Sequence, residues 1–313
     1  MTLVQRADSS GERQDQGGPA GPRCPVCGGD GTPFRSAVEV GRDLRDTLAL
    51  HESTTEGPPL KLMHDEAVEL AGCGICGTLW RRDPRLWSSA VSSYRSDRYD
   101  ASALAALHED EVQLAERDAP WLVAHGVGPE TRLLEVASYV GGFLAVASGL
   151  GASVLGIDPN PQLVTWCVER GLTAEVATIE DLVPPDGAPS GAGATTGDLD
   201  GVWILNCFDQ LPDPRGTLRA ARRLLRVGGR LVIRTPNAGF VRAAYASGDP
   251  TLCHAARRQV LWGLPHLCCY TVGGLCDLVQ QFGFALSSVR PRPTDAPTPG
   301  TEPAWVDLSA LAC

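Results

Sequence analysis

The sequence predicts an α/β protein in which a Rossmann-like, doubly wound sheet of seven strands follows a small zinc-binding module. Two observations carry this prediction. Short apolar segments alternate with segments of helical periodicity from residue 132 onward, and repeated β-α units of this length indicate a parallel sheet covered by helices on both faces. Upstream, CxxC pairs stand at residues 24–27 and 73–76, a spacing typical of a metal site.

Changes in composition divide the chain into five parts. Residues 1–22 are polar and lack the apolar core of a secretory signal, so we expect a disordered tail. We assign 23–99 to the zinc-binding module and the segment leading out of it, 100–126 to connecting helices, 127–290 to the cofactor-binding domain, and 291–313 to a Pro-rich loop with a terminal strand. Low-complexity stretches at Val183–Asp198 and Arg290–Pro303 predict flexible loops.

The first two parts contain few regular elements. Within the zinc-binding module, Ser36–Val40 and Leu60–Met63 are candidate strands. Apolar residues then recur at roughly helical spacing between Asp100 and Ala124. This periodicity predicts one or two helices that connect the module to the sheet.

Seven strands and four helices are predicted for the sheet and its covering layers. The strands are apolar runs of four to six residues at Arg132–Ala137, Ser153–Asp158, Ala174–Ala177, Gly201–Asn206, Arg230–Thr235, Ala285–Val289 and Trp305–Leu308. The helices are Gly141–Gly149, Pro161–Arg170, Pro214–Arg226 and Val272–Phe282. Gly171 and Gly228 provide helix stops, and Pro236 breaks the fifth strand.

Charge and cysteine usage exclude several classes of protein. The formal net charge is -10, and an acidic protein repels a phosphate backbone, so no nucleic-acid partner is expected. Val136–Ile157 lacks charged residues, yet it is rich in Gly, Ala and Ser and divides into strand, turn, helix and strand, so no membrane span is expected. Eleven cysteines, four of them in CxxC pairs, favour a reducing cytoplasm and a metal site over a disulfide framework.

The four paired cysteines predict a structural zinc site. Each pair places two thiolates on one tight turn, and a glycine follows each pair, at Gly28 and Gly77. Two such knuckles form a closed tetrahedral sulfur site that leaves no open position for water. The predicted ligands are Cys24, Cys27, Cys73 and Cys76. The long gap between the pairs keeps the alternative of four buried free cysteines open.

An adenosine ligand is predicted where the first two strands end. Residues 133–143 form a strand, a turn of small residues and the start of a helix. A carboxylate at the end of the second strand accepts hydrogen bonds from ribose hydroxyls in such sheets. The candidate contacts are Glu135, Ala137, Ser138, Tyr139, Gly141, Asp158, Pro159, the pair Glu180 and Asp181 near the adenine, and Asn206 at the end of the fourth strand.

Charge selects among adenosine ligands. A dinucleotide requires G-x-G-x-x-G so that backbone N–H groups approach its pyrophosphate, whereas Tyr139 obstructs that approach here. Glu135 repels a pyrophosphate and attracts the ammonium of a methionine moiety. The sequence therefore predicts S-adenosyl-L-methionine over NAD, with a cofactor-free sheet as the alternative.

Four further segments carry a family pattern. They are Cys73–Trp80 with Pro84, Tyr94 and Tyr99; Asp200–Pro214; Leu224–Ile233 with Thr235–Asn237; and Pro265–Leu267 with Gly283–Phe284. With them the chain resembles, over roughly Cys24 to Val289, the class I S-adenosylmethionine-dependent methyltransferases that carry an N-terminal cysteine-rich zinc-binding module. The resemblance implies the class I methyltransferase fold, this cofactor and methyl transfer.

The chain departs from that family at three places. Ala137 and Tyr139 stand where the family's turn carries glycine, and Asp209-Gln210 replaces the usual Glu-His pair after the fourth strand. The second large C-terminal domain of the deoxysugar C-methyltransferases is not seen, which disfavours sugar C-methylation. The departures at Tyr139 and Gln210 motivate one alternative, a non-catalytic protein that binds an adenosyl ligand.

Methyl transfer from a sulfonium requires mainly the alignment of nucleophile, carbon and sulfur. A general base assists when the nucleophile is a hydroxyl or an acidic carbon. The candidates are His266, which precedes the last helix, and behind it Asp209 and Tyr270; a structural role for His266 is the alternative. Tyr94 and Tyr99 are candidates for a lid over the cofactor.

The sequence thus favours a methyltransferase acting on a small-molecule, biosynthetic acceptor. Three alternatives remain: a non-catalytic binding partner, an RNA methyltransferase and, more distantly, a nicotinamide oxidoreductase. The net charge of -10 disfavours the RNA substrate. The acceptor atom and the oligomeric state are left open.

Overall fold

A computed structural model describes residues 23–36, 38–40, 42, 69–183, 197–260, 266–292 and 303–313. The predicted tail, the predicted strand Leu60–Met63 and most of the two low-complexity loops lie outside these ranges. Among the described residues, no helix combines the length and the apolar character needed to cross a membrane.

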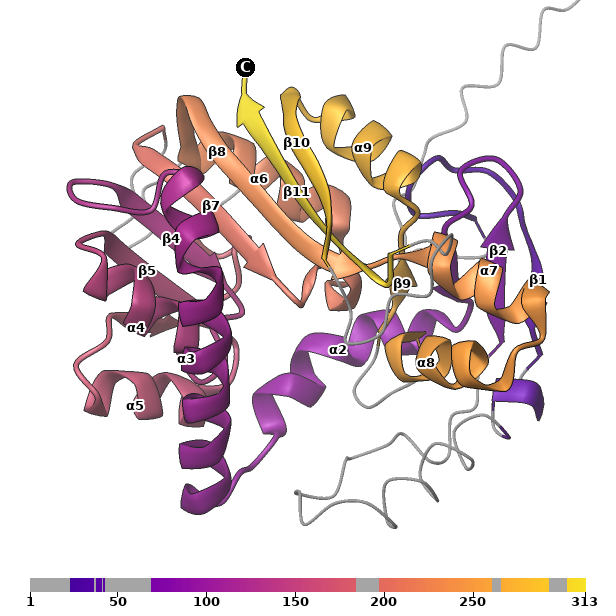
Figure 1. The fold of residues 1–313 in the computed structure, drawn as a ribbon, viewed down its shortest axis with the longest axis horizontal. Helices are drawn as coiled ribbons and strands as arrows, with labels where there is room; N and C mark the ends of the chain where they lie inside the picture. The colour runs from indigo at the N-terminus through magenta and orange to yellow at the C-terminus, as the bar shows by residue number, and fades with distance from the viewer. Residues whose placement is uncertain are drawn as a thin grey trace, which may run out of the picture.

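A seven-stranded mixed sheet forms the centre of the molecule (Figure 1), as the sequence predicts. Its order is β10-β11-β8-β7-β4-β5-β6. The strands are β4 (Arg132–Val136), β5 (Ser153–Asp158), β6 (Ala174–Val176), β7 (Leu199–Leu205), β8 (Leu225–Pro236), β10 (Phe284–Arg292) and β11 (Trp305–Ala312). The strands from β4 to β8 are parallel, and β11 runs antiparallel between β8 and β10.

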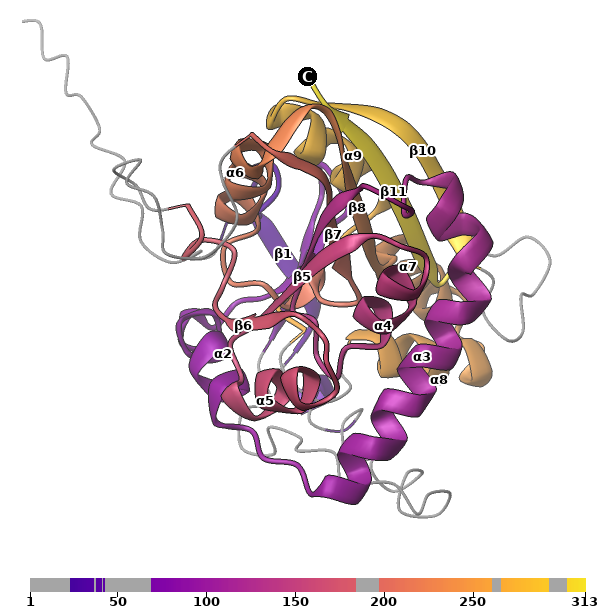
Figure 2. The same ribbon diagram turned by 90° about the vertical axis from the view of Figure 1, so that its left-hand side faces the viewer.

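Helices cover both faces of this sheet, which is the doubly wound arrangement. On one face lie α3 (Ala101–Ala124), α4 (Gly142–Gly149) and α5 (Pro161–Glu169), the side seen in Figure 2. On the other lie α6 (Pro214–Leu224) and α9 (Val272–Gln281). Side chains alternate between the two cores along a strand: Leu133 packs in the first core and Leu134 in the second.

A second, four-stranded antiparallel sheet holds the cysteine pairs. It contains β1 (Gly31–Arg35), β2 (Leu70–Cys73), β3 (Leu79–Arg81) and β9 (Cys268–Cys269) in that order. It lies beside α7 (Ala238–Ser247) and α8 (Pro250–Val260) in Figure 1. Its last strand comes from the C-terminal part of the chain, and its apolar cluster, which includes Trp80, continues into the core of the large sheet. The cysteine module is therefore built onto the large sheet.

The strand predicted at Ser36–Val40 is wrong, and the reason is local. The strand is Gly31–Arg35, and residues 38–40 are helical. Ser36 and Glu39 bond reciprocally: the Ser36 backbone N–H donates to Glu39 Oε2 at 2.9 Å, and the Glu39 N–H donates to Ser36 Oγ at 3.4 Å. This is the S-x-x-E capping box, a helix-start signal.

Three helices were not predicted, namely α2 (Pro84–Ser96), α7 and α8. Each of the first two begins at a side-chain cap: the Asp83 side chain accepts from the Arg85 backbone N–H, and the Asn237 side chain accepts from the Gly239 N–H. The connecting segment is one long helix, α3, despite Pro120 within it.

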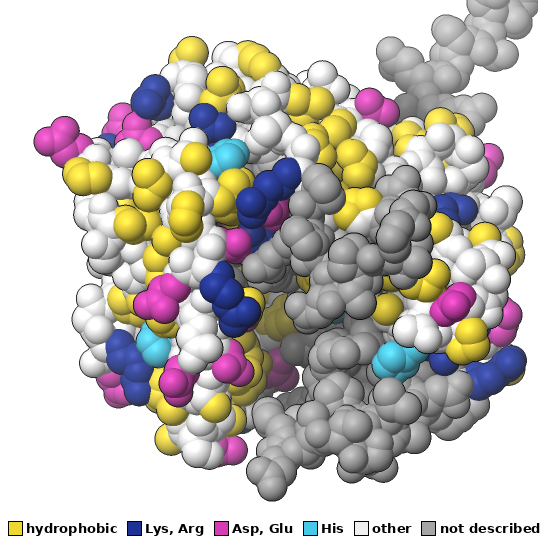
Figure 3. Space-filling view, in the orientation of Figure 1, with side chains coloured by type: hydrophobic (Ala, Val, Ile, Leu, Met, Phe, Trp, Pro, Cys, Tyr) yellow, Lys and Arg dark blue, Asp and Glu magenta, His cyan; other side chains and the backbone are white. Residues whose placement is uncertain are grey.

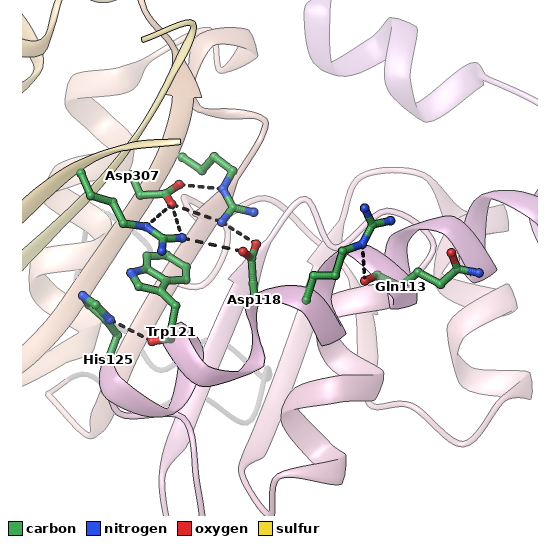
Figure 4. Close-up of polar contacts among 8 residues, drawn as sticks. Gln113, Asp118, Trp121, His125 and Asp307 are labelled. Atoms are coloured by element: carbon green, nitrogen blue, oxygen red, sulfur yellow. Dashed lines mark hydrogen bonds and ion pairs between the residues drawn. The ribbon is translucent and has the colours of Figure 1, made fainter. Parts of the chain in front are cut away.

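A largely buried ion network fastens α3 to the strands β8, β11 and β10 (Figure 4). Asp118 of α3 lies 2.7 Å from Arg234 of β8, and Asp307 of β11 accepts from both Arg234 and Arg290. The guanidinium groups of both arginines also lie over the Trp121 ring, 5.3 Å and 4.4 Å from its centroid. Two cations and two anions balance within this network.

Candidate active site

A cavity of about 430 Å³ opens where the parallel strands end. Val136, Asp158, Leu205 and Arg234, from the carboxyl ends of β4, β5, β7 and β8, all line it. Helices α2 and α3 supply another wall through Tyr94, Glu111, Leu114 and Asp118. In doubly wound sheets this edge is where ligands bind.

The turn after β4 keeps the backbone conformation of glycine although glycine is absent. Ala137 and Tyr139 have φ values of 56° and 50°, in the left-handed region. The Ser138 backbone N–H donates to Ile157 O at 3.0 Å, which holds the turn against β5. Two residues with side chains thus occupy left-handed positions in this turn.

Tyr139 lines the cavity and does not fill it. Its ring stands edge-on to Tyr99, with centroids 6.1 Å apart. Burial raises the pKa of Tyr139 well above its ordinary value, with further contributions from Tyr99 and Glu111. Tyr139 therefore forms an aromatic wall with the segment after α2.

Glu135 places a buried carboxylate on the cavity. It is 6% exposed, and its Oε2 has no hydrogen-bond partner among the described residues. Burial raises the pKa of Glu135 well above its usual range, and the nearby carboxylates of Glu111 and Asp158 raise it further. An unpartnered buried carboxylate fits a cationic group such as an ammonium.

Asp158 is held in place by two backbone N–H groups. Asn160 N donates to Oδ1 at 2.8 Å, and Tyr139 N donates to Oδ2 at 3.0 Å. Burial raises the pKa of Asp158 to about 6, and the two backbone hydrogen bonds oppose that rise. Each carboxylate oxygen keeps a lone pair for a further donor such as a ribose hydroxyl.

Eight of the ten predicted cofactor residues line the cavity: Glu135, Ala137, Ser138, Tyr139, Asp158, Pro159, Glu180 and Asn206. The other two do not. Gly141 caps α4 at φ 82°, where an added Cβ would lie 2.7 Å from Leu172. Asp181 turns back to accept from the Thr178 backbone and hydroxyl at 2.8 and 2.9 Å. Both residues shape the local backbone.

The predicted catalytic residues separate into a pair and an outlier. His266 lines the cavity, and its Nδ1 is hydrogen-bonded to Oδ2 of Asp209, which is 1% exposed. Tyr270 is fully buried, does not line the cavity and packs on Phe208 at 5.2 Å between centroids. A catalytic role for Tyr270 therefore finds no support in its position.

Gln210, which stands where the family has histidine, joins the cavity wall. Its Oε1 accepts from the Tyr94 hydroxyl, and its Nε2 donates to Asn206 O at 3.1 Å. The imidazole on the cavity instead comes from His266, 56 positions later in the chain.

Two residues that the sequence pattern did not indicate, Asn160 and Gln162, fasten the segment around the end of α2 over the cavity. Asn160 Nδ2 donates to Tyr94 O at 2.9 Å and to Asp97 O at 3.0 Å. Gln162 pairs with the Tyr99 backbone, accepting at 3.0 Å and donating at 2.7 Å. The motif Asn160-Pro161 is a helix-start signal in which the asparagine side-chain oxygen caps the helix. It does not reveal what the amide nitrogen of the same side chain will bind.

The four paired cysteines converge. Their sulfur atoms all lie within 4.8 Å of one another. Gly28 and Gly77 have φ values of 71° and 75°, as expected for the residue after each knuckle. The Ile75 and Cys76 backbone N–H groups donate to Cys73 Sγ at 3.3 and 3.4 Å. Four thiols in a closed group fit a tetrahedral ion such as zinc.

This fold, with its cavity and acidic strand ends, defines a class I S-adenosylmethionine-dependent methyltransferase. A family model described as a methyltransferase domain matches residues 85–289, and the chain belongs to that family. A ubiquinone biosynthesis O-methyltransferase of Xanthomonas oryzae pv. oryzae is 33% identical over 112 residues, which are 34% of this chain and 43% of that protein. The match thus spans less than half the length of these curated relatives.

Two solved structures resemble the fold. An S-adenosylmethionine-dependent methyltransferase from Mesorhizobium loti is 22% identical with a TM-score of 0.47, covering 62% of this chain and 97% of that one. A geranyl diphosphate C-methyltransferase from Streptomyces coelicolor A3(2) is 13% identical with a TM-score of 0.47, covering 73% and 98%.

Proposed function

We propose that this methyltransferase acts on a hydroxyl group of a small-molecule acceptor, with His266 as general base. The observation that carries the proposal is that His266, at the wall of the cavity, is hydrogen-bonded to the buried Asp209 behind it. The curated relatives that match part of the chain are named O-methyltransferases.

Carboxylates near the carboxyl ends of β4 and β5 would hold the cofactor. When bound, S-adenosylmethionine supplies an electrophilic methyl group on a sulfonium. The Glu135 carboxylate, with its unpartnered Oε2, binds the ammonium of the methionine moiety. Asp158 would accept from the ribose hydroxyls, and the adenine would lie beside Glu180, which lines the cavity with Thr178 and Ile179.

Asp209 fixes the tautomer of His266. With a carboxylate at Nδ1, that nitrogen carries the proton, and Nε2 is left as the proton acceptor. Nε2 would take the hydroxyl proton as the acceptor oxygen displaces the sulfonium sulfur from the methyl carbon, which leaves the methylated acceptor, S-adenosylhomocysteine and an imidazolium. Asp209 then stabilises the resulting imidazolium from its buried position.

A small acceptor suits both the cavity and the surface. A volume of about 430 Å³ lies in the range of small-molecule sites. Acidic and basic side chains are interspersed on the face in Figure 3, and the net charge is -10. Such a surface disfavours a nucleic-acid acceptor, whose backbone calls for a basic stripe.

Zinc bound by Cys24, Cys27, Cys73 and Cys76 forms part of this proposal. The closed group of four thiols supports a structural ion. Its place is in the module, because the cavity lining contains none of the four sulfurs.

Two measurements test the function. Calorimetric titration with S-adenosylhomocysteine, with NADH as control, should give saturable binding of the first alone. Methyl transfer from labelled S-adenosylmethionine to a panel of mono- and dihydroxylated aromatics should follow. H266Q should lower the transfer rate by about 10²–10⁴-fold with unchanged S-adenosylhomocysteine affinity.

His125, which does not line the cavity, provides the matched control. Its ring contacts Trp121 and Ser288, so H125Q should retain the wild-type rate. Full activity of H266Q on the same acceptor would exclude His266 as the general base. Cofactor binding without transfer to any acceptor would favour the non-catalytic alternative.

A further inference from the structure

We propose that Arg81 of the cysteine module is a positioning residue for His266, so that the module contributes to the active site. The inference rests on the proposed function of His266 as the base. Its test is chosen to read the geometry of the imidazole directly.

Arg81 donates two hydrogen bonds to neighbouring backbone carbonyls, one to His266 and one to Leu267. Its Nε donates to His266 O at 2.9 Å, and its backbone N–H donates to Leu267 O at 3.0 Å. These contacts continue the pairing of β3 with β9, in which Trp80 stands opposite Cys268. The histidine therefore lies two residues before β9, a strand that pairs with β3 at one edge of the small sheet.

Arg81 is itself firmly held. The residue is 5% exposed, and burial lowers the pKa of its guanidinium to about 10, so it remains charged at neutral pH. The Trp87 indole Nε1–H donates to Arg81 O at 2.9 Å. A charged donor that is already ordered loses little side-chain entropy when it holds a carbonyl.

The opposite side of the same backbone is held by Asp209. The Leu267 N–H donates to Asp209 O at 2.9 Å, and the Asp209 carboxylate binds His266 Nδ1. His266 and Leu267 are thus fixed between the module and the loop that follows β7. Replacing the Arg81 side chain removes the hydrogen bond to His266 O, while the backbone N–H at position 81 still donates to Leu267 O. The carbonyl next to the imidazole then loses its charged donor, and Asp209 alone holds the ring.

The neighbouring arginine provides a contrast. Arg82 pairs with Glu69 at 2.9 Å, and both side chains are about one-third exposed. Neither contacts His266 in any interaction between described residues. Replacement of Arg82, the residue directly after β3, therefore changes charge by the same amount next to Arg81 without touching the histidine.

The Nδ1 proton of His266 is the primary readout. Histidine-labelled protein is studied by ¹H–¹⁵N NMR, and the resonance that disappears in H266Q is assigned to His266. In R81L we expect this resonance to move or broaden, while S-adenosylhomocysteine affinity stays within about twofold. On the best acceptor of the hydroxyl panel, kcat should fall at least about tenfold with KM for the cofactor unchanged. R82L should behave as wild type.

A conservative variant keeps the proposal testable if R81L does not fold. R81K retains a donor near the carbonyl and should give an intermediate resonance shift and an intermediate kcat. An unmoved Nδ1 resonance in a folded Arg81 variant would overturn the proposal. Parallel loss of the resonance and of S-adenosylhomocysteine binding would also overturn it, because that identifies a general structural role. If H266Q is fully active while R81L still shifts the His266 resonance, His266 is not the general base, but Arg81 still positions its imidazole.

Discussion

Asp307 and Arg234 face each other across the pair β8–β11, with 2.7 Å between Asp307 Oδ1 and Arg234 Nε. Asp307 is 1% exposed, and it also binds Arg290 Nε at 2.9 Å. A single carboxylate thus joins three strands of the sheet, and Figure 4 shows it beside Asp118 of α3. Its removal leaves the buried guanidinium of Arg234 and the partly exposed one of Arg290 without the counter-charge that they share at Asp307.

We therefore expect D307N to lower the free energy of unfolding by about 3–5 kcal/mol. Urea denaturation at neutral pH measures this change. The exposed carboxylate of Asp30, 4.0 Å from Arg23, is the control, and D30N should have almost no effect. A loss in D307N no larger than in D30N would show that the network is not stabilising.

Replacing Glu135 with glutamine should weaken binding of the cofactor and, at the same time, stabilise the unliganded protein. E135Q removes the charge that pairs with an ammonium, so S-adenosylhomocysteine should bind about 10–100-fold more weakly. The same change removes a buried carboxylate whose pKa is raised by burial, so the unliganded protein should melt at a higher temperature. E109Q on the exposed side of α3 serves as control. Equal affinity of E135Q and wild type would place the ammonium elsewhere.

The pKa of about 6 at Asp158 predicts a pH dependence. Because the folded-state pKa lies above the ordinary 3.8, the folded protein binds this proton more tightly than the unfolded chain does. Stability from this group is therefore full below about pH 4 and declines by about 3 kcal/mol as the pH rises through 6. Ribose hydroxyls favour the carboxylate form, so cofactor affinity should weaken below pH 6. Carboxyl ¹³C NMR measures the pKa, and a value near 4 would contradict the prediction.

The left-handed residues of the turn should respond differently to glycine. A137G relieves the strain at φ 56° and should stabilise the protein by up to about 1 kcal/mol. Y139G relieves the same strain but removes the ring packed on Tyr99, so it should be net destabilising. A145G in the middle of α4 has no strain to relieve and should cost about 1 kcal/mol. Thermal melting of the three variants gives the order.

Metal analysis tests the cysteine module. Purified protein should contain one zinc per chain, and C73S should lose it together with several kcal/mol of stability. Cys167, buried beneath the turn after β4 and outside the sulfur cluster, is the matched control, and C167S should keep the metal. Less than half a zinc per chain in wild type would exclude the site.

The sheet could be predicted largely from periodicity, because buried parallel strands are apolar runs separated by helices. The predicted strand Ser153–Asp158 has the bounds of β5, and the others differ mainly at their ends. The elements that were missed depend on distant partners: β9 has two residues and exists as a strand because β3 lies beside it. No local pattern encodes such pairing.

The candidate site shows the same limit. Residues at strand ends, such as Glu135 and Asp158, could be placed on the cavity because parallel strands end at one edge. In the segment after His266, the sequence could not predict which side chains face the cavity and which face the core; Tyr270 is buried in the core. The contact between Arg81 and His266, 185 positions apart, depends on how two sheets meet.

The place of β11 between β8 and β10 has a consequence for synthesis on the ribosome. Until Trp305–Ala312 has been translated, β10 has no neighbour to join and β8 presents an open edge to other chains. Until then Arg234 also lacks its ion pair with Asp307, because that carboxylate lies on β11. The nascent chain should therefore remain prone to aggregation, and dependent on chaperones, until β11 docks.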